Sequence, residues 1–251
     1  MLASFMKSHD IPYPRSVRFN PADPDTENDL AKLPLPIIAK TEWGGGGAAM
    51  RVFNNRDELI PYLHHEFTDT RPIIVQQFIQ GIDLGCAVFC RNGKILCSVV
   101  QKKITSGANP LAASKAIQFI DDQRVLDIVG LLMESLHWNG IAQVDLVQQE
   151  STKDLFVLEI NPRYWGSMIG ALKMGINFPE ISCRIALGLP VVPMVYSKGK
   201  YITPQGYILY VLSLIKGQNQ PERFRLSDSN FDGILSDPIP RILEFFNPKW
   251  R

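Results

Sequence analysis

The chain has 251 residues, of which 45% are hydrophobic and 20% are charged. This length allows one large domain or two small lobes, and the composition is that of an ordinary globular protein. The formal net charge of +1 provides no strong field, so we expect no nucleic-acid or acidic-membrane partner. Residues 1–7 lack a long apolar segment, so no signal peptide is expected.

The first half of the chain is expected to alternate short helices and strands. Leu2, Phe5 and Met6 have helical spacing, and the prolines at 12 and 14 then predict an extended segment. Periodicity and turn residues predict helices over 23–33 and 55–67, and strands over 36–40, 50–53, 73–79, 83–90 and 94–104. Asn92 and Gly93 lie between the last two strands, where they predict a tight hairpin turn.

The second half begins with a polar segment over 105–116 that we expect to be irregular and mobile. A helix is predicted over 125–136, followed by strands over 141–147 and 157–161 and by helices over 166–173 and 179–187. Residues after 188 are less regular, with surface turns expected at 198–200 and 237–240. The apolar run 207–215 is about half of the roughly 20 residues a membrane helix needs, so we expect a packed helix there.

The four cysteines form no metal-binding or redox pair in the sequence. Cys86, Cys90, Cys97 and Cys183 include no C-x-x-C spacing, and Cys86 and Cys90 lie too far apart along one strand for an easy disulfide. Buried, reduced thiols are therefore expected, which favours a cytoplasmic protein.

Polar residues gather at the end of the apolar run 157–163. Glu159, Asn161 and Arg163 occupy alternate positions, which place their side chains on one face of a strand. Asp145 lies fourteen residues before Glu159 in another apolar run, and two antiparallel strands would bring these residues together. Such oxygen ligands suit Mg²⁺, and the Arg163 guanidinium suits phosphate oxygens. The sequence thus predicts a metal site that handles phosphate, although strand-end capping is an alternative for Glu159 and Asn161.

Lys40 ends a predicted strand and precedes a run of four glycines, Gly44, Gly45, Gly46 and Gly47. Glycine backbones can approach phosphate oxygens closely, and a nearby lysine adds positive charge. No Walker A sequence follows. A flexible hairpin tip with a surface lysine remains the alternative interpretation.

The segment 75–83 offers a third set of ligand-binding groups. Its apolar core could present backbone groups to an adenine edge, and the carboxylate of Asp83 could accept ribose hydroxyls.

The order of these motifs resembles the ATP-grasp superfamily over about residues 11–188, and the carboxylate–amine ligases and the carbamoyl-phosphate synthetase lobes within it. The resemblance implies an α+β fold whose two lobes carry mainly antiparallel sheets, with ATP in the cleft between them. It assigns Lys40 to the phosphates, Gly44–Gly47 to a lid, Gln77, Phe78 and Ile79 to adenine, and Asp83 to ribose. Asp145, Glu159 and Asn161 would bind one or two Mg²⁺ ions, or Mn²⁺, and Arg163 would stabilise the transferring phosphoryl group. Of Lys102 and Lys103, one is expected to face the site; alternation alone does not say which, and Lys103 is taken as the second catalytic cation.

The resemblance also implies a division of the chain and a reaction. Residues 1–10 would be the end of a helix that leads in from a missing N-terminal domain, 11–79 the small lobe, 80–190 the large lobe, and 191–251 an extension packed on it. The family usually has a glutamate near Gln77, which puts the adenine and ribose contacts in doubt. The expected partners are small carboxylate and amine substrates, a separate N-terminal domain or subunit, and a second copy in a homodimer. The implied activity is ATP-dependent ligation through an acyl phosphate; a non-catalytic ATP-binding module and a bicarbonate-using carboxylase are the alternatives.

Overall fold

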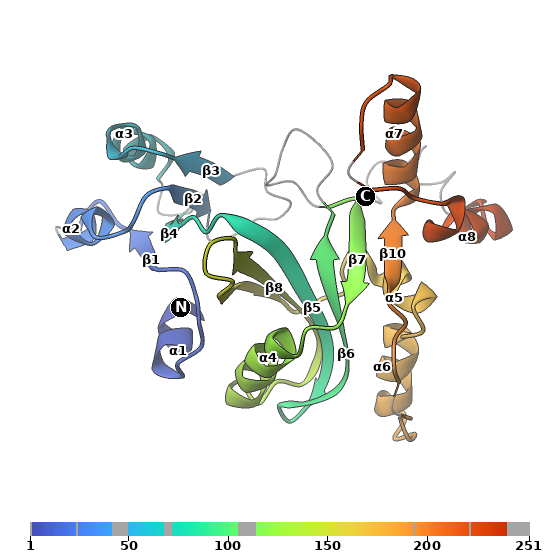
Figure 1. The fold of residues 1–251 in the computed structure, drawn as a ribbon. Helices are drawn as coiled ribbons and strands as arrows, with labels where there is room; N and C mark the ends of the chain where they lie inside the picture. Colours follow the sequence, from blue (N-terminus) through green and yellow to red (C-terminus); the bar gives the residue numbers. More distant parts are fainter. Residues whose placement is uncertain are drawn as a thin grey trace.

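The computed structural model describes residues 2–23, 25–41, 50–67, 72–104, 114–192, 194–220 and 222–239. Two antiparallel sheets, one of four strands and one of six, dominate the molecule (Figure 1). The predicted α+β fold with two mainly antiparallel sheets is therefore confirmed. Within the described residues, no helix is both long and apolar enough to cross a membrane.

The smaller sheet has the strand order β1-β4-β2-β3. Its strands are β1 (Ser16–Phe19), β2 (Ile37–Thr41), β3 (Met50–Phe53) and β4 (Ile73–Gln77). Its core contains Ile37, Ala39 and Val75, with residues of α2 (Asp25–Ala31) and α3 (Arg56–Glu66). Because side chains alternate along a strand, Lys40 and Gln76 lie on the opposite face of this sheet.

The larger sheet has the strand order β10-β7-β6-β5-β8-β9. Its strands are β5 (Gly81–Arg91), β6 (Lys94–Lys103), β7 (Ala116–Ile120), β8 (Gly140–Gln149), β9 (Leu155–Asn161) and β10 (Gly199–Ile202). The β5–β6 turn has positive φ at Asn92 (49°) and Gly93 (79°), as the two central residues of a type I′ hairpin require. The predicted hairpin is confirmed.

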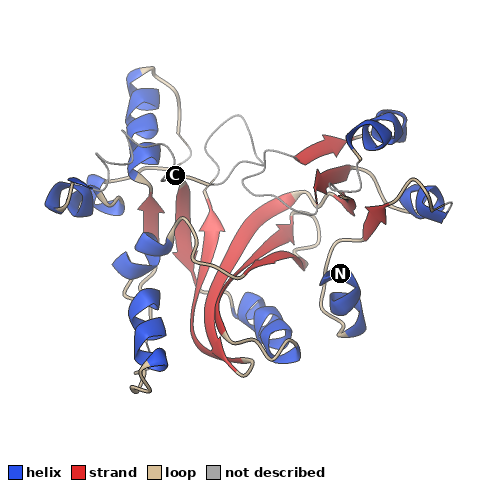
Figure 2. Cartoon of the chain, turned by 180° about the vertical axis from the view of Figure 1, so that it is seen from behind, coloured by secondary structure: helices blue, strands red, loops and turns tan. Residues whose placement is uncertain are grey.

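Helices cover both faces of the larger sheet. Residues of α1 (Leu2–Ser8) and α4 (Gln123–Ser135) share one hydrophobic core with strands β5, β6, β8 and β9. The opposite face is covered by α5 (Met168–Lys173) and α6 (Phe178–Ala186), which Figure 2 shows in front of the sheet. Beyond β10 lie α7 (Pro204–Ile215), a short 3₁₀ helix (Leu226–Asp228) and α8 (Phe231–Ser236).

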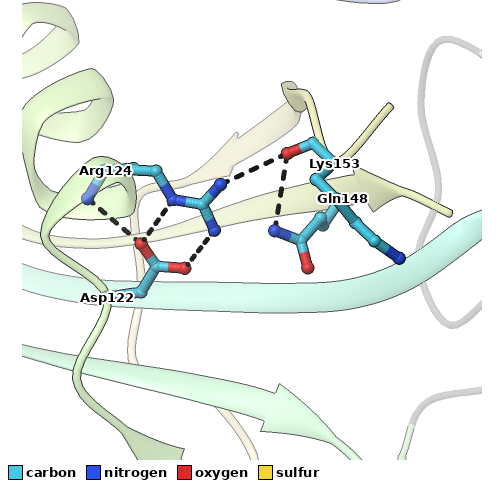
Figure 3. A network of polar contacts seen from close by, with 4 residues as sticks. All are labelled: Asp122, Arg124, Gln148 and Lys153. Atoms are coloured by element: carbon cyan, nitrogen blue, oxygen red, sulfur yellow. Dashed lines mark hydrogen bonds and ion pairs between the residues drawn. The ribbon is translucent and has the colours of Figure 1, made fainter. Parts of the chain in front are cut away.

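The N-terminus of α4 is fastened to the turn between β8 and β9 (Figure 3). Asp122 caps the helix by accepting from the Arg124 backbone N–H at 3.1 Å, and the Arg124 guanidinium binds the same carboxylate. Arg124 Nη1 also donates to the Lys153 carbonyl at 3.4 Å, and Gln148 donates to it at 3.5 Å. The helix therefore supports the two strands that carry the predicted metal ligands.

Four expectations need correction. Ala116 is not part of an irregular segment but begins β7, and residues 199–202 form β10 instead of a surface turn. Both are short strands, and the burial of residues such as Tyr201 becomes apparent only once the two strands pair. Cys183 is exposed, while the other three cysteines are buried and reduced as expected. The helix predicted near 207–215 exists as α7, but its apolar side chains are largely exposed, namely Ile208, Leu209, Leu212, Leu214 and Ile215.

Candidate functional site

The predicted metal ligands meet on one face of the β8–β9 hairpin. Asp145 lies directly opposite Glu159, and Gln143 lies opposite Asn161. The Asn161 Nδ2 donates to Asp145 Oδ2 at 3.1 Å and to Glu159 Oε1 at 2.7 Å. The amide thus bridges two carboxylates, as a divalent cation would.

The donor set fits Mg²⁺ or Mn²⁺. Within the described residues, no three carboxylate, imidazole or thiol side chains converge, so the third protein oxygen would come from the Asn161 amide. Hard cations of this kind accept carboxylate and amide oxygens, and Mg²⁺ usually completes its shell with water and substrate phosphates. Arg163 lies beside the set, with Nη2 donating to Asn161 Oδ1 at 3.2 Å and Nη1 donating to the Tyr164 carbonyl at 3.3 Å.

Burial raises the pKa of Asp145 to about 7 in the metal-free protein. A hydrogen bond from Gln143 opposes this rise, and the neighbouring Glu159 carboxylate adds to it. A metal ion favours the ionised carboxylates, so metal binding should release a proton from this cluster below about pH 7.

We expect Asp145→Asn to flatten the pH dependence of stability in metal-free buffer. The folded chain keeps the Asp145 proton above pH 3.8, where the unfolded chain has lost it. The wild type should therefore lose stability as pH rises from about 4 to about 7, and the uncharged amide cannot contribute to this loss. Urea unfolding of both proteins across that range measures the difference. Parallel stability curves would show that Asp145 titrates normally.

Lys40, on the smaller sheet, lies close enough to the larger sheet to interact with Glu159. Its Nζ donates to Gln76 Oε1 at 3.1 Å, and Gln76 Nε2 donates to Ser16 Oγ at 2.8 Å. Burial lowers the pKa of Lys40, while the negative charge of Glu159 opposes that change. The lysine of one sheet and the carboxylate of the other therefore interact electrostatically.

The segment predicted to hold adenine begins at the last residue of β4. Gln77, Phe78 and Ile79 line a pocket of about 460 Å³ with Leu35, Pro36, Gln80 and the β8–β9 turn residues Gln149, Glu150 and Ser151. The lining of this pocket does not include Lys40, Asp83 or the metal ligands. The backbone N–H groups of Gln77 and Phe78 donate to Arg15 and Pro36 carbonyls. An adenine contact through the backbone at Gln77 or Phe78 would thus use a carbonyl oxygen.

Asp83 and Lys103 form an ion pair in this structure. Lys103 Nζ lies 3.0 Å from Asp83 Oδ2, and the two residues come from neighbouring strands β5 and β6. Their side chains lie on the same sheet face as Asp145, because Gly85, two residues after Asp83, pairs with Asp145. Lys103, and not Lys102, therefore lies on the same face of the larger sheet as Asp145.

The glycines Gly44–Gly47 and residues 105–113 lie outside the described part of the chain. The structure adds three polar residues that the sequence interpretation missed, namely Gln76, Gln101 and Gln143, all less than 10% exposed. Gln101 and Gln143 lie two residues before Lys103 and Asp145 on the same strands. Gln76 pairs with Ile38, which lies two residues before Lys40. Polar side chains in otherwise apolar strands were the available signal.

Comparison with known proteins agrees with this geometry. Residues 1–167 match a family model described as an ATP-grasp domain. The chain belongs to the ATP-grasp family. The match covers the smaller sheet, Arg163, and the strands that carry Asp83, Lys103, Asp145, Glu159 and Asn161.

The ATP-grasp relatives and solved structures are distant. Carbamoyl phosphate synthase large chain from Clostridium perfringens is 24% identical over 186 residues, which is 70% of this chain and 17% of the relative. The chain thus spans about a sixth of such relatives. N5-carboxyaminoimidazole synthetase from Staphylococcus aureus, solved with ADP, superposes with a TM-score of 0.67 at 16% identity, covering 85% of this chain and 58% of that one. L-amino acid ligase from Bacillus licheniformis gives 0.56 at 20% identity, with 73% and 45% covered.

Proposed function

We propose that this ATP-grasp chain binds Mg·ATP between its two sheets and activates a carboxylate as an acyl phosphate for capture by an amine. The observation that carries the proposal is the convergence of Asp145, Glu159 and Asn161 beside Arg163, with Lys40 acting on Glu159 from the other sheet. Opposed cations and oxygen ligands on two lobes form a site for a metal-bound polyphosphate.

Each residue would have a separate task. Lys40 would bind phosphate oxygens, and the segment Gln77–Ile79 would hold adenine. Ribose hydroxyls would compete with Lys103 for the Asp83 carboxylate, which would release Lys103 toward the phosphates. Asp145, Glu159 and Asn161 would hold Mg²⁺, which supplies positive charge to the phosphates. Arg163 would neutralise charge that develops on the transferring phosphoryl group.

The chemistry has two steps. A carboxylate oxygen of the first substrate attacks the γ-phosphorus of ATP, and the bond between that phosphorus and the bridging oxygen of ADP breaks. The amine then attacks the acyl carbon, the carbon–nitrogen bond forms, and phosphate leaves while the amine loses a proton. The protein contributes mainly by positioning and by charge neutralisation, since phosphoryl transfer needs little covalent chemistry from it.

The proposal extends to the organisation and surroundings of the chain. We propose a small lobe over 11–79, a large lobe over 80–190 and an extension over 191–251. The substrates would be small molecules in the cytoplasm. The C-terminal extension would add β10 to the sheet of the large lobe.

Substrate screening tests the reaction. Amino acids, short peptides and other organic acids would be offered with Mg·ATP, and ADP release measured. Hydroxylamine would trap an activated acid as its hydroxamate. A hydroxamate formed with one class of acid supports the ligase. ADP release that requires bicarbonate alone would indicate a carboxylase instead, and metal-dependent ATP binding without turnover would indicate a non-catalytic module.

We expect Mg·ATP to stabilise the chain against unfolding. A ligand present at about 100 times its Kd adds roughly 2.7 kcal/mol when it binds the folded state alone. Thermal unfolding with Mg·ATP, with ATP and EDTA, and with Mg²⁺ alone measures the shift. An unchanged midpoint at millimolar Mg·ATP would contradict nucleotide binding by this chain.

A further inference from the structure

Two glutamine side chains, Gln101 and Gln143, lie on the same face of the larger sheet as the proposed metal ligands. Gln101, Gly85, Asp145 and Glu159 form one direct cross-strand row over β6, β5, β8 and β9. The adjacent row contains Val99, Ala87, Gln143 and Asn161. Gln101 on β6 therefore lies directly beside Gly85 on β5, and Gln143 on β8 lies diagonally across from Gly85, next to Asp145.

The two amides are buried. Gln143 is 4% exposed and Gln101 is 9% exposed. Gln143 Nε2 donates to Asp145 Oδ1 at 3.2 Å, while Asn161 donates to the other oxygen of that carboxylate. Both carboxylate oxygens of Asp145 thus accept hydrogen bonds from side-chain amides, which fixes the plane of the carboxylate.

Gly85 provides the space in which these amides lie. A Cβ atom added at Gly85 would stand 2.4 Å from Gln143 Nε2 and 2.9 Å from Gln101 Nε2. Both contacts are to the far ends of flexible side chains, so any larger residue would displace the amides before it displaced the backbone. Because Gly85 has no side chain, the Gln143 amide has room to lie where it can bind Asp145.

Ser167 holds the second buried amide, that of Gln101. Its Oγ donates to Gln101 Oε1 at 3.0 Å, although as the residue before α5 it could have capped that helix and does not. Gln143 Oε1 is buried and lacks a hydrogen-bond partner among the described residues. The hydrogen bond to Asp145 and the packing over Gly85 therefore hold the Gln143 amide, even though leaving its buried carbonyl unpaired is unfavourable.

We propose that Gln143, whose amide lies over Gly85 beside that of Gln101, is the positioning residue that orients Asp145 for the metal ion. The inference rests on the proposed function, because it concerns the same site. Residues around metal ligands typically change metal affinity 10–100-fold when they are replaced. Gly85 acts on the metal through Gln143, and Gln143 acts through Asp145.

The test measures metal affinity directly, with Mn²⁺ as the probe. Free Mn²⁺ is titrated by electron paramagnetic resonance against the full chain in the presence of ATP. Gln143→Met keeps the length of the side chain but removes its amide, and Gly85→Ala displaces both amides. Each should raise the Kd for Mn²⁺ about 10–100-fold, while ATP affinity in EDTA stays within about twofold of the wild type.

Matched controls isolate the network from general effects. Gln148→Met changes a glutamine of the same strand whose side chain lies on the opposite face, where it donates to the Lys153 carbonyl. Gly130→Ala adds a methyl group to α4 where no atom lies within 4 Å apart from the neighbouring residues and the nearby backbone of the helix itself. Both controls should bind Mn²⁺ like the wild type. The double variant Gly85→Ala with Gln143→Met should be no weaker than the weaker single variant, since the two act in series.

The outcomes separate the two proposals. A wild type that shows no metal-dependent ATP binding overturns the proposed function. A wild type that binds Mn·ATP, with Gln143→Met unchanged, overturns the positioning role alone. The positioning role would also be overturned if Gln143→Met lowered ATP affinity equally with and without metal, because the side chain would then stabilise the fold and not the metal site. If Gly85→Ala does not fold, Gln143→Met decides the question.

Discussion

Glu159→Gln should abolish the dependence of ATP binding on magnesium while leaving metal-free binding nearly intact. Glu159 faces Asp145 directly and accepts a hydrogen bond from Asn161 at 2.7 Å. The glutamine side chain keeps a dipole, but the substitution removes one of the two negative charges that Asp145 and Glu159 provide. Titrations of ATP at several magnesium concentrations should show a steep dependence in the wild type and a flat one in the variant.

Lys40→Ala provides the contrasting result. Lys40 would act on phosphate charge directly, so its loss should weaken ATP binding by about 1.5–3 kcal/mol with or without metal. Glu134→Gln and Lys94→Ala, which change exposed residues of α4 and β6, serve as matched charge controls. If Glu159→Gln and Lys40→Ala respond identically to magnesium, the separate roles given to the two residues are wrong.

The sequence was sufficient to predict those parts of the fold that a local pattern determines. Alternating apolar residues and the Asn92–Gly93 turn defined the β5–β6 hairpin, because that turn needs two residues with positive φ. The pairing of Asp145 with Glu159 followed from two apolar runs separated by a short connection, which favours an antiparallel hairpin. The proximity of Asp145 to Glu159 and Asn161 could therefore be predicted before any register was known.

Other features depend on contacts between distant segments. Strands β7 and β10 are short, and their burial arises from pairing across about 80 residues of sequence. The space that Gly85 provides is equally invisible in the sequence, because a glycine in a strand also marks bulges and bends. Its role appears only when the register places Gln101 and Asp145 on either side of it. Side-chain partners such as Asp83 and Lys103 likewise require the register of β5 with β6.

Arg163→Ala should lower the rate of carboxylate-dependent ADP release about 100–1000-fold, with little effect on ATP affinity. Removing one preorganised donor that stabilises transition-state charge typically costs this much in kcat. Arg163 is exposed in this structure, and its fork contacts only Asn161 Oδ1 and the Tyr164 carbonyl among the hydrogen bonds described for it. The guanidinium is therefore placed to meet a substrate phosphate.

Arg163→Lys separates charge from geometry. Lysine keeps the positive charge but loses the planar fork that binds two phosphate oxygens together, so its rate should fall between those of the wild type and the alanine variant. Steady-state rates with the acid identified by hydroxamate trapping give kcat and KM for each protein, and the Mn²⁺ titration reports whether Asn161 has moved. Since Arg163 also holds Asn161, a Mn²⁺ affinity that falls in step with kcat would assign Arg163 to metal positioning. An unchanged kcat with a raised KM would contradict a role in phosphoryl transfer, because the contact would then stabilise bound substrate and transition state equally.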